Sequence, residues 1–350
     1  MHERWGQGAL KSRVDQELER FVRTEIDALL AVDEALAPLG DVLTAVTAHG
    51  KRLRSSFCYW GWRAAGQPDS DAMVRAAASM ELVHAAAVVH DDIIDESGLR
   101  HGLPTAHVAL RKVFPEKPRR TARARSLAML AGDLLMAWAG QLFATCGLPA
   151  AYLAQARGLW GVLARELIAG EALEILHTAA EPDVRRSLKV IRYKTAKYTV
   201  EHPLHIGAAL AGADTRVREV FSAYGLPLGE AFQLRDDLMG LFGEPATTGK
   251  ANTDDLTGAR PTALMALAQQ AATPTERAEL AGLLGRGGLT SGQLERVRAV
   301  VERTGARRRI EDMIAERVAL ATGALHGAGL PEDARRAMTH LATASTARQN

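Results

Sequence analysis

Helical periodicity recurs along nearly the whole 350-residue chain, and no other feature of the sequence restricts the fold as strongly. Apolar residues return every three to four positions, which is the spacing of one face of an amphipathic helix. Alanine and leucine dominate, runs of β-branched residues are short, and the sequence lacks strand–turn–helix alternation. A doubly wound parallel sheet is therefore excluded, and we expect an all-α fold.

The expected helices are long in the first part of the chain and shorter in the last third. The long ones span 12–36, 69–95, 119–145, 150–177, 182–211 and 215–239, and the shorter ones 262–270, 275–284, 291–304, 308–325 and 331–342. Short glycine- and proline-rich breaks separate them, and none resembles a flexible interdomain linker. We therefore expect a single domain over 1–350, with flexible polar ends at about 1–10 and 343–350.

Charge and cysteine content exclude several classes of protein. Lys and Arg total 43 against 41 Asp and Glu, so the net charge of +2 gives no field that would attract nucleic acid. The two cysteines, Cys58 and Cys146, form neither a CxxC pair nor a disulfide framework, which indicates a reducing cytoplasm. The N-terminus lacks a signal-peptide pattern, and no uncharged apolar run reaches about 18–20 residues, so no transmembrane segment is expected.

An aspartate cluster follows a long apolar stretch in the expected helix 69–95. Asp91 and Asp95 are four residues apart, so on a helix they share a face, with Cβ atoms about 6 Å apart. Two carboxylates at that distance repel each other unless a cation lies between them. Mg²⁺ commonly binds one or two carboxylates together with substrate phosphates. The alternative is a solvated acidic helix end, which the flanking valine and isoleucine pairs disfavour.

A second pair, Asp236 and Asp237, ends another apolar helix about 145 residues later. Two such pairs suggest facing walls of one cavity, with metal ions and a diphosphate between them. Lys51 and Arg54 stand three apart at an expected helix start, where unbonded backbone N–H groups also attract anions. Further donors for a diphosphate are Arg100, Lys194, Thr195 and Lys250. Each alone has the pattern of a solvated surface residue, whereas the ordered set favours a binding site.

The ordered series resembles the trans-isoprenyl diphosphate synthases, which include the farnesyl, geranylgeranyl and longer polyprenyl diphosphate synthases, and in places it resembles their actinobacterial members. The motifs that carry the resemblance are Gly50 to Arg54, His84, Asp91 to Asp95, Arg100, Gly102 to Thr105, Gly132-Asp133, Lys194-Thr195, Phe232 to Asp237, and Gly249-Lys250. They cover roughly residues 38–262. The resemblance implies a single-domain isoprenoid synthase bundle of long antiparallel helices around a central cavity, acting as a cytoplasmic homodimer.

The resemblance also implies a reaction and a set of ligands. A Mg²⁺-dependent prenyl transferase would condense isopentenyl diphosphate with an allylic diphosphate, head to tail (1′-4), through an allylic carbocation. About three Mg²⁺ ions are expected from the resemblance, with Asp91, Asp95 and Asp236 as ligands. Asp92 and Lys194 complete the implied catalytic set. Other implied contacts are Arg100, Lys194, Thr195 and Lys250 for the allylic diphosphate, Gln233 and Asp237 beside Asp236, and Lys51, Arg54 and His84 for isopentenyl diphosphate.

Several residues depart from the family pattern. His101 stands where a second arginine usually helps to hold isopentenyl diphosphate; histidine lacks the guanidinium fork and is neutral for much of the time at pH 7. This predicts weaker isopentenyl binding or a different second substrate. Gly240 replaces a third aspartate, and Arg260 keeps the charge of a usual lysine. Ser55 replaces a proline with little expected effect, and Glu171 replaces a glutamine with no consequence that the sequence assigns.

The residues that precede Asp91 on its helix face bear on product length. Ala87 is four residues before Asp91, Ala86 five and Met80 eleven, so Met80 lies about 16 Å below the aspartate. In the family a bulky aromatic residue four or five positions before the aspartate gives short products. Two alanines there favour products of C20 or longer. The alternative is that Ala86 and Ala87 only pack against a neighbouring helix.

Three competing hypotheses stay open. A class I terpene cyclase would ionise a prenyl diphosphate in the same way without isopentenyl diphosphate, and His101 is compatible with it. A partner subunit of a heteromeric synthase is disfavoured because both aspartate clusters are present. A purely structural helical protein leaves the ordered motifs unexplained.

Overall fold

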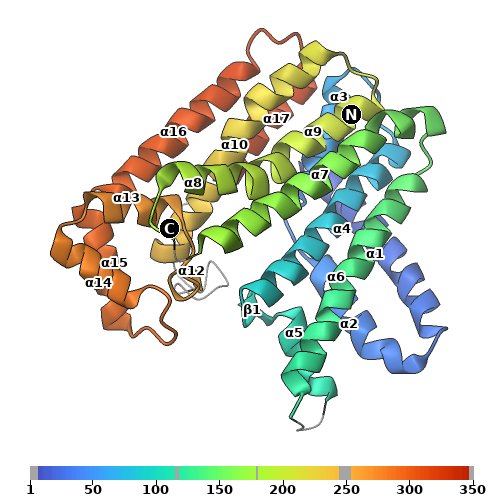
Figure 1. The fold of residues 1–350 in the computed structure, drawn as a ribbon. Coiled ribbons are helices and arrows are strands. Elements are labelled where there is room, and N and C mark those ends of the chain that lie inside the picture. The colour runs from blue at the N-terminus through green and yellow to red at the C-terminus, as the bar shows by residue number, and fades with distance from the viewer. Residues whose placement is uncertain (1–6, 115–117, 179, 244–253, 347–350) are drawn as a thin grey trace. The chain divides into compact units, whose positions relative to one another are not determined.

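The computed structural model describes residues 7–114, 118–178, 180–243 and 254–346 (Figure 1). Helices dominate this part of the chain; two-residue strands β1 (Leu99–Arg100) and β2 (Leu103–Pro104) form its one antiparallel pair. The all-α prediction is confirmed. The chain divides into two compact units, the first comprising Met1–Arg157 and Pro203–Ala213 and the second Gly158–His202 and Asp214–Asn350. A single domain over the whole chain stays a prediction.

The first unit is built around one long central helix, α4 (Asp71–Ile94), against which α1, α3 and α6 pack. Ser70 caps the N-terminus of α4, its hydroxyl accepting a hydrogen bond from the Met73 N–H. The other elements of this unit are α1 (Gln7–Leu30), η2 (Glu34–Leu36), α2 (Ala37–Ala48), α3 (Leu53–Ala64), α5 (Ala106–Ala109), η3 (Leu110–Val113), α6 (Arg120–Ala144), the first two turns of α7 (Ala150–His177) and most of α9 (His202–Leu210).

Two glycines bring α9 into direct contact with α3. A Cβ atom on Gly207 would lie 1.9 Å from the Cys58 carbonyl oxygen, and one on Gly61 would lie 2.4 Å from the Leu204 carbonyl oxygen. Both neighbours are backbone atoms, which cannot move aside. The two helices can therefore pack this closely only with glycine at these positions.

The second unit is built around α10 (Thr215–Phe242), which packs against η4 and α16 (Figure 1). Asp214 caps α10 by accepting from the Val217 N–H. The other elements are the rest of α7, α8 (Val184–Val190), η4 (Ile191–Glu201), α12 (Asp254–Thr257), α13 (Ala263–Ala271), α14 (Pro274–Leu283), α15 (Ser291–Arg303), α16 (Ala306–Ala324) and α17 (Glu332–Thr346). Their buried side chains form one core, which includes Leu234, Leu238, Leu264, Leu280, Val301 and Ile310.

The expected helix 182–211 is three consecutive helical segments, α8, η4 and α9, and its middle segment η4 is π-helical. Gly229 of α10 permits its close approach, because a Cβ atom there would lie 2.3 Å from the Ala196 Cα atom. π-Helical turns occur frequently at functional sites. This one carries Lys194 and Thr195, two residues predicted to bind a diphosphate.

Most expected helix boundaries agree with the structure to within a few residues, and 150–177 matches α7. The expected helix 12–36 is wrong at both ends: α1 begins at Gln7 and ends at Leu30, and Asp33 then caps the separate turn η2. Helix α2 was not predicted, whereas the helix start expected around Lys51 and Arg54 is confirmed, because α3 begins at Leu53. At the C-terminal end α17 continues to Thr346, with Ser345 and Thr346 buried.

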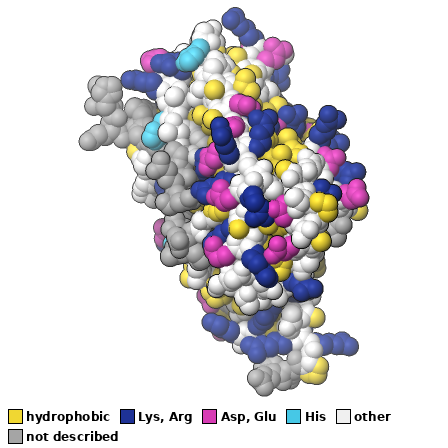
Figure 2. Space-filling view, turned by 90° about the vertical axis from the view of Figure 1, so that its left-hand side faces the viewer, with side chains coloured by type: hydrophobic (Ala, Val, Ile, Leu, Met, Phe, Trp, Pro, Cys, Tyr) yellow, Lys and Arg dark blue, Asp and Glu magenta, His cyan; other side chains and the backbone are white. Residues whose placement is uncertain are grey.

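By length and composition alone, α4 and α6 are apolar enough to cross a membrane. In α4, 72% of the most apolar stretch is buried within the protein, as in the core helix of a soluble protein, and in α6 the share is 44%. On the face that Figure 2 shows, acidic and basic side chains are interspersed.

Candidate functional site

The first aspartate cluster lies at the C-terminal end of α4. Asp95 is the C-cap residue, and its N–H donates to the Asp91 carbonyl oxygen over 2.8 Å, so one residue stands a full turn above the other. Asp91 and Asp95 are partly exposed, whereas Asp92 is 2% exposed and points inward. Two carboxylates on one accessible face is the arrangement that the spacing predicted.

Arg100 reaches this cluster from the hairpin β1–β2. Its Nη2 atom lies 2.9 Å from Asp91 Oδ2 and 2.5 Å from Asp92 Oδ1, and its Nε donates to Asp92 Oδ1 over 3.0 Å. His101 (φ 52°) and Gly102 (φ 77°) form the left-handed turn that folds Arg100 back onto α4. Burial alone would lower the pKa of Arg100, but the two aspartates outweigh it and raise the pKa. Arg100 therefore contacts the predicted metal ligand Asp91 directly.

His90 fastens the end of α4 to α6. Its Nε2 atom lies 3.2 Å from the Met129 carbonyl oxygen and 3.4 Å from Asp133 Oδ1. The ring fits because residue 132 is glycine: a Cβ atom there would lie 2.2 Å from His90 Nε2. The Gly132-Asp133 motif thus holds the residue that directly precedes Asp91.

The residues of the basic motif before α3 differ in burial and in their contacts. Arg52 is buried in a left-handed conformation (φ 54°), with Nε 2.7 Å from Asp15 Oδ1 and Nη2 donating to the Thr47 carbonyl oxygen. It anchors the start of α3, whereas Lys51 is exposed. The Ser55 N–H donates to Oε1 of the buried Glu81 over 2.8 Å, a bond that the usual proline cannot make.

His84 lies two turns below Asp91 on α4. Its pKa is well below the ordinary value, because burial and the nearby charges of Arg54 and Arg100 disfavour the imidazolium. His84 is therefore neutral at pH 7. It can form a hydrogen bond with an anion but adds no positive charge, whereas Lys51, Arg52 and Arg54 carry the charge of the basic motif.

In the second unit a hydrogen-bonded chain connects η4 to α10. Thr195 Oγ1 donates to Gln233 Oε1 over 2.8 Å, and Gln233 Nε2 donates to Asp237 Oδ1 over 2.9 Å. Asp237 is buried, whereas the adjacent Asp236 is partly exposed. These hydrogen bonds fix the side chain of Asp237, whereas Asp236 is the more accessible carboxylate of the pair.

Lys194 is held by two glutamates of α7. Its Nζ atom lies 2.8 Å from Glu171 Oε2 and closer still to Glu174 Oε2. The sequence assigned no consequence to Glu171 and did not point to Glu174. Their spacing could have indicated that both glutamates contact one cation, since residues three apart on a helix share a face.

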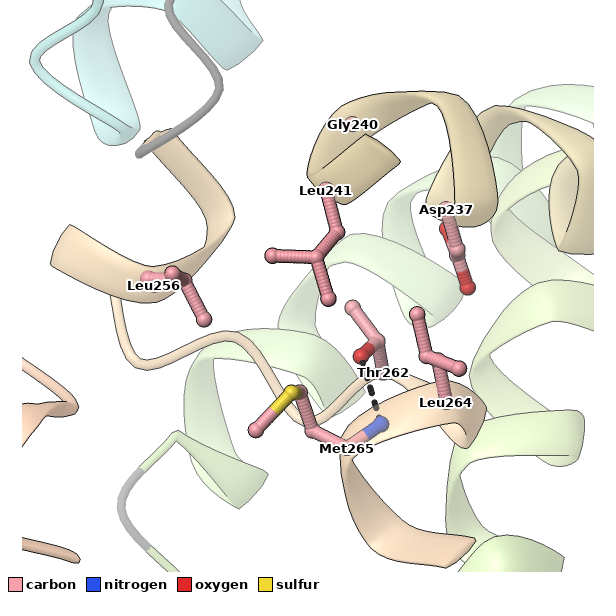
Figure 3. A pocket seen from close by; sticks show the side chains of 7 residues that line it. All are labelled: Asp237, Gly240, Leu241, Leu256, Thr262, Leu264 and Met265. Atoms are coloured by element: carbon pink, nitrogen blue, oxygen red, sulfur yellow. Dashed lines mark hydrogen bonds between the residues drawn. The ribbon is translucent and has the colours of Figure 1, made fainter. Parts of the chain in front are cut away.

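A small hollow of about 10 Å³, room for about one water, lies between Asp237 and the segment that leads into α13 (Figure 3). Gly240, Leu241, Leu256, Thr262, Leu264 and Met265 complete its lining. Thr262 Oγ1 caps α13 by accepting from the Met265 N–H over 3.2 Å. The hollow is largely apolar on the side of Gly240, where a third aspartate is usual. Arg260 is partly buried just before Thr262, and Lys250 lies outside the described residues.

The carboxylates fit Mg²⁺ that is shared with a phosphate ligand. Within the residues that the structure describes, no three His, Cys, Asp or Glu side chains converge closely enough to form a metal cage. Mg²⁺ does not need one, because it commonly takes one or two carboxylates and completes its octahedron with water and phosphate oxygens. Asp91 with Asp95 suits this mode, as does Asp236.

The predicted site residues thus form two sets, one in each compact unit. The first comprises Asp91, Asp92, Asp95, Arg100, His101, His84, Lys51 and Arg54, and the second comprises Lys194, Thr195, Gln233, Asp236, Asp237 and Arg260. That the two sets face one cavity stays a prediction. For product length, Met80 and Ala86 are fully buried and Ala87 is partly exposed on the face of Asp91.

Comparisons with known proteins agree on one family. The model of the polyprenyl synthetase family matches residues 37–301. A geranylfarnesyl diphosphate synthase of Aeropyrum pernix is 32% identical over 248 residues, which are 69% of this chain and 74% of that protein. A (2E,6E)-farnesyl diphosphate synthase of Mycobacterium tuberculosis is 33% identical over 208 residues, 59% of this chain and 53% of that protein.

A solved structure is similar over nearly the whole chain. It is a geranylgeranyl pyrophosphate synthase from Corynebacterium glutamicum, complexed with isoprenyl diphosphate and magnesium. The TM-score is 0.90 at 31% sequence identity, and the match covers 97% of this chain and 99% of that one. The likeness therefore extends to helices on both sides of the matched family region.

Proposed function

Since this chain belongs to the polyprenyl synthetase family and transfers prenyl groups, we propose that it condenses isopentenyl diphosphate with an allylic diphosphate in a Mg²⁺-dependent reaction. The observation that carries the proposal is the contact of Arg100 with Asp91 and Asp92 at the accessible end of α4. A cation already lies against the carboxylates that would hold the metal. Such a site suits a ligand that brings both metal ions and phosphate oxygens.

Each set of residues has a role in the proposed reaction. Asp91, Asp95 and Asp236 would hold Mg²⁺, which would supply positive charge to stabilise the departing diphosphate. Arg100 and Lys194 donate hydrogen bonds to that diphosphate, and Thr195 does so once its hydroxyl turns away from Gln233. Lys51 and Arg54 bind isopentenyl diphosphate by charge, and neutral His84 by a hydrogen bond.

The proposal includes one cavity lined by both residue sets and a product of C20 or longer. Support for the length comes from the small side chains of Ala86 and Ala87, which lie about one turn below Asp91. The names of the relatives range from farnesyl to nonaprenyl diphosphate synthases. Product length therefore needs a direct measurement.

Homodimerisation in the cytoplasm is also part of the proposal. Two long helices carry exposed apolar side chains: Met129 and Leu130 of α6 are 50% and 52% exposed, and Ile168 and Leu176 of α7 are 65% and 75% exposed. Neighbouring exposed apolar side chains on one helix are candidates for an association surface. A second copy of the chain is the proposed occupant, and sedimentation equilibrium tests it.

One assay tests the reaction. The pure protein is incubated with Mg²⁺, labelled isopentenyl diphosphate and, in turn, dimethylallyl, geranyl, farnesyl or geranylgeranyl diphosphate. Elongated diphosphates are the expected products, and their chain length is read directly. Hydrocarbons or alcohols formed without isopentenyl diphosphate would instead identify a terpene cyclase. Turnover only after addition of another chain would identify a subunit of a heteromeric synthase.

A further inference from the structure

Arg52 lies between Lys51 and Arg54 with its backbone in a left-handed conformation. Its φ of 54° is one that residues with a side chain rarely adopt, because the Cβ atom crowds a neighbouring carbonyl oxygen. Arg52 is also the N-cap residue of α3, so its backbone angles set the direction in which Lys51 leaves the start of the helix. Such a conformation persists only where surrounding contacts hold it. The placement of Lys51 relative to Arg54 therefore depends on the contacts of Arg52.

The buried side chain of Arg52 supplies contacts of this kind. Its Nε atom lies 2.7 Å from Oδ1 of Asp15 in α1, and its Nη2 atom donates to the Thr47 carbonyl oxygen at the end of α2 over 2.7 Å. A Cβ atom added at Gly50 would lie 3.4 Å from Arg52 Nη1, so the guanidinium group folds back against the segment that precedes Lys51. One side chain thus joins α1, the end of α2 and the segment that carries Lys51.

The backbone of Arg52 holds the first turn of α3, which carries Arg54. The Arg52 carbonyl oxygen accepts hydrogen bonds from the hydroxyls of Ser55 and Ser56 over 2.9 and 2.7 Å. It also accepts from the Ser56 N–H over 3.0 Å. These bonds act on the side of Arg54, and the guanidinium contacts act on the side of Lys51.

Asp15 is a contact of Arg52 that carries the opposite charge. Its Oδ1 atom lies beside Arg52, and its Oδ2 atom lies 2.6 Å from Lys11 Nζ. Partial burial alone would raise the pKa of Asp15, but the hydrogen bonds and charges of Lys11 and Arg52 outweigh it and lower the pKa. The carboxyl group is therefore ionised at neutral pH. An ionised acceptor holds a guanidinium group more strongly than a neutral carbonyl oxygen does.

We propose that Asp15 is a positioning residue for the second substrate. It holds Arg52 in the left-handed conformation that presents Lys51 and Arg54 together to isopentenyl diphosphate, and the inference rests on the proposed function. For a residue with a Cβ atom the left-handed region is disfavoured by about tenfold. Without the Asp15 carboxylate, residue 52 leaves this region for much of the time. The affinity for isopentenyl diphosphate then falls in proportion to the fraction of molecules that retain it.

Steady-state kinetics of the full chain test this with two matched variants. Asp15→Ala should raise the KM for isopentenyl diphosphate about tenfold and leave kcat and the KM for geranyl diphosphate unchanged. Asp69→Ala is the control, because Asp69 also attaches α1: its Oδ1 atom lies 3.0 Å from Nη1 of Arg13 in α1 and accepts from the Tyr59 hydroxyl. This variant should lower the melting temperature at least as much as Asp15→Ala and leave the KM for isopentenyl diphosphate unchanged.

Replacement of Arg52 by glycine separates backbone conformation from charge. Glycine enters the left-handed region without a steric cost, so Asp15→Ala/Arg52→Gly should recover a KM within about threefold of the wild type. It should do so although both partners of the ion pair are gone. If Arg52 instead binds the diphosphate directly, the double variant should have a higher KM than Asp15→Ala alone.

Three results would overturn the inference and leave the proposed function standing. They are an unchanged KM for isopentenyl diphosphate in Asp15→Ala, an equal rise in Asp69→Ala, and a higher KM in the double variant than in Asp15→Ala. Asp15→Asn keeps an oxygen acceptor for Arg52 and replaces Asp15→Ala if that variant does not fold, with an expected rise of about threefold. A wild-type protein that elongates no allylic diphosphate with isopentenyl diphosphate would overturn both the inference and the proposed function.

Discussion

Substitution of Gly132 by alanine tests how the end of α4 is held in place. The added Cβ atom would lie 2.2, 2.5 and 2.8 Å from Nε2, Cδ2 and Cε1 of the His90 ring. Ordinary van der Waals contact begins near 3.4 Å, so the ring must retreat by about 1 Å. Overpacking of this kind costs about 1–3 kcal/mol, and the gain in helix propensity returns about 0.5–1 kcal/mol. The net loss of stability is therefore modest, about 0–2.5 kcal/mol.

The loss of activity should be larger than the loss of stability. His90 directly precedes Asp91, so its retreat moves a predicted metal ligand, and a misplacement of 1 Å can cost about 10²-fold in rate. We expect kcat to fall by about that factor and the Mg²⁺ concentration for half-maximal activity to rise. Gly140→Ala is the matched control, because it lies in the same helix with no atom within 4 Å of its added Cβ. A Gly132→Ala protein with unchanged kcat and Mg²⁺ dependence would refute the reasoning.

Four further substitutions give distinct outcomes. Asp91→Ala should abolish turnover, measured by product formation, while the melting temperature stays within a few degrees of the wild type. His101→Arg should lower the KM for isopentenyl diphosphate about tenfold, because it adds a bidentate charged donor; a higher KM would contradict this. Ala87→Phe should shorten the product by at least one C5 unit. An unchanged product length would mean that other residues limit chain elongation. Gly207→Ala should destabilise the fold by more than about 2 kcal/mol in denaturant titration, since its Cβ would lie 1.9 Å from the backbone oxygen of Cys58.

The parts of the site that the sequence predicted are those that local spacing encodes. The separation of Asp91 and Asp95 by four residues requires only that the segment be helical, and the apolar periodicity before them shows that it is. The α7 boundaries, 150–177, follow from the same periodicity between clear breaks. Agreement is good for helices that lie between clear breaks, whereas the helix expected at 12–36 is wrong at both ends.

The parts that the sequence missed depend on pairs of residues far apart in the chain. The bond from Ser55 to Glu81 joins positions 26 apart, and the ion pair of Arg52 with Asp15 joins positions 37 apart. Neither pairing produces a local sequence pattern. The sequence therefore did not distinguish the structural role of Arg52 from the binding role expected for Lys51 and Arg54. The π-helical turn η4 likewise depends on the close approach of Gly229 to Ala196, which is a property of the packed helices.

The two predicted diphosphate ligands Arg100 and Lys194 differ in what their departure leaves behind. Arg100 contacts Asp91, a proposed Mg²⁺ ligand, so an arriving metal ion can replace its charge and set the guanidinium group free for phosphate. Lys194 contacts Glu171 and Glu174, neither of which is a proposed Mg²⁺ ligand. Exchange at Arg100 should therefore respond to Mg²⁺ concentration more strongly than exchange at Lys194 does. Raising the Mg²⁺ concentration should therefore increase diphosphate affinity where release of Arg100 limits binding. It should not do so where release of Lys194 limits binding.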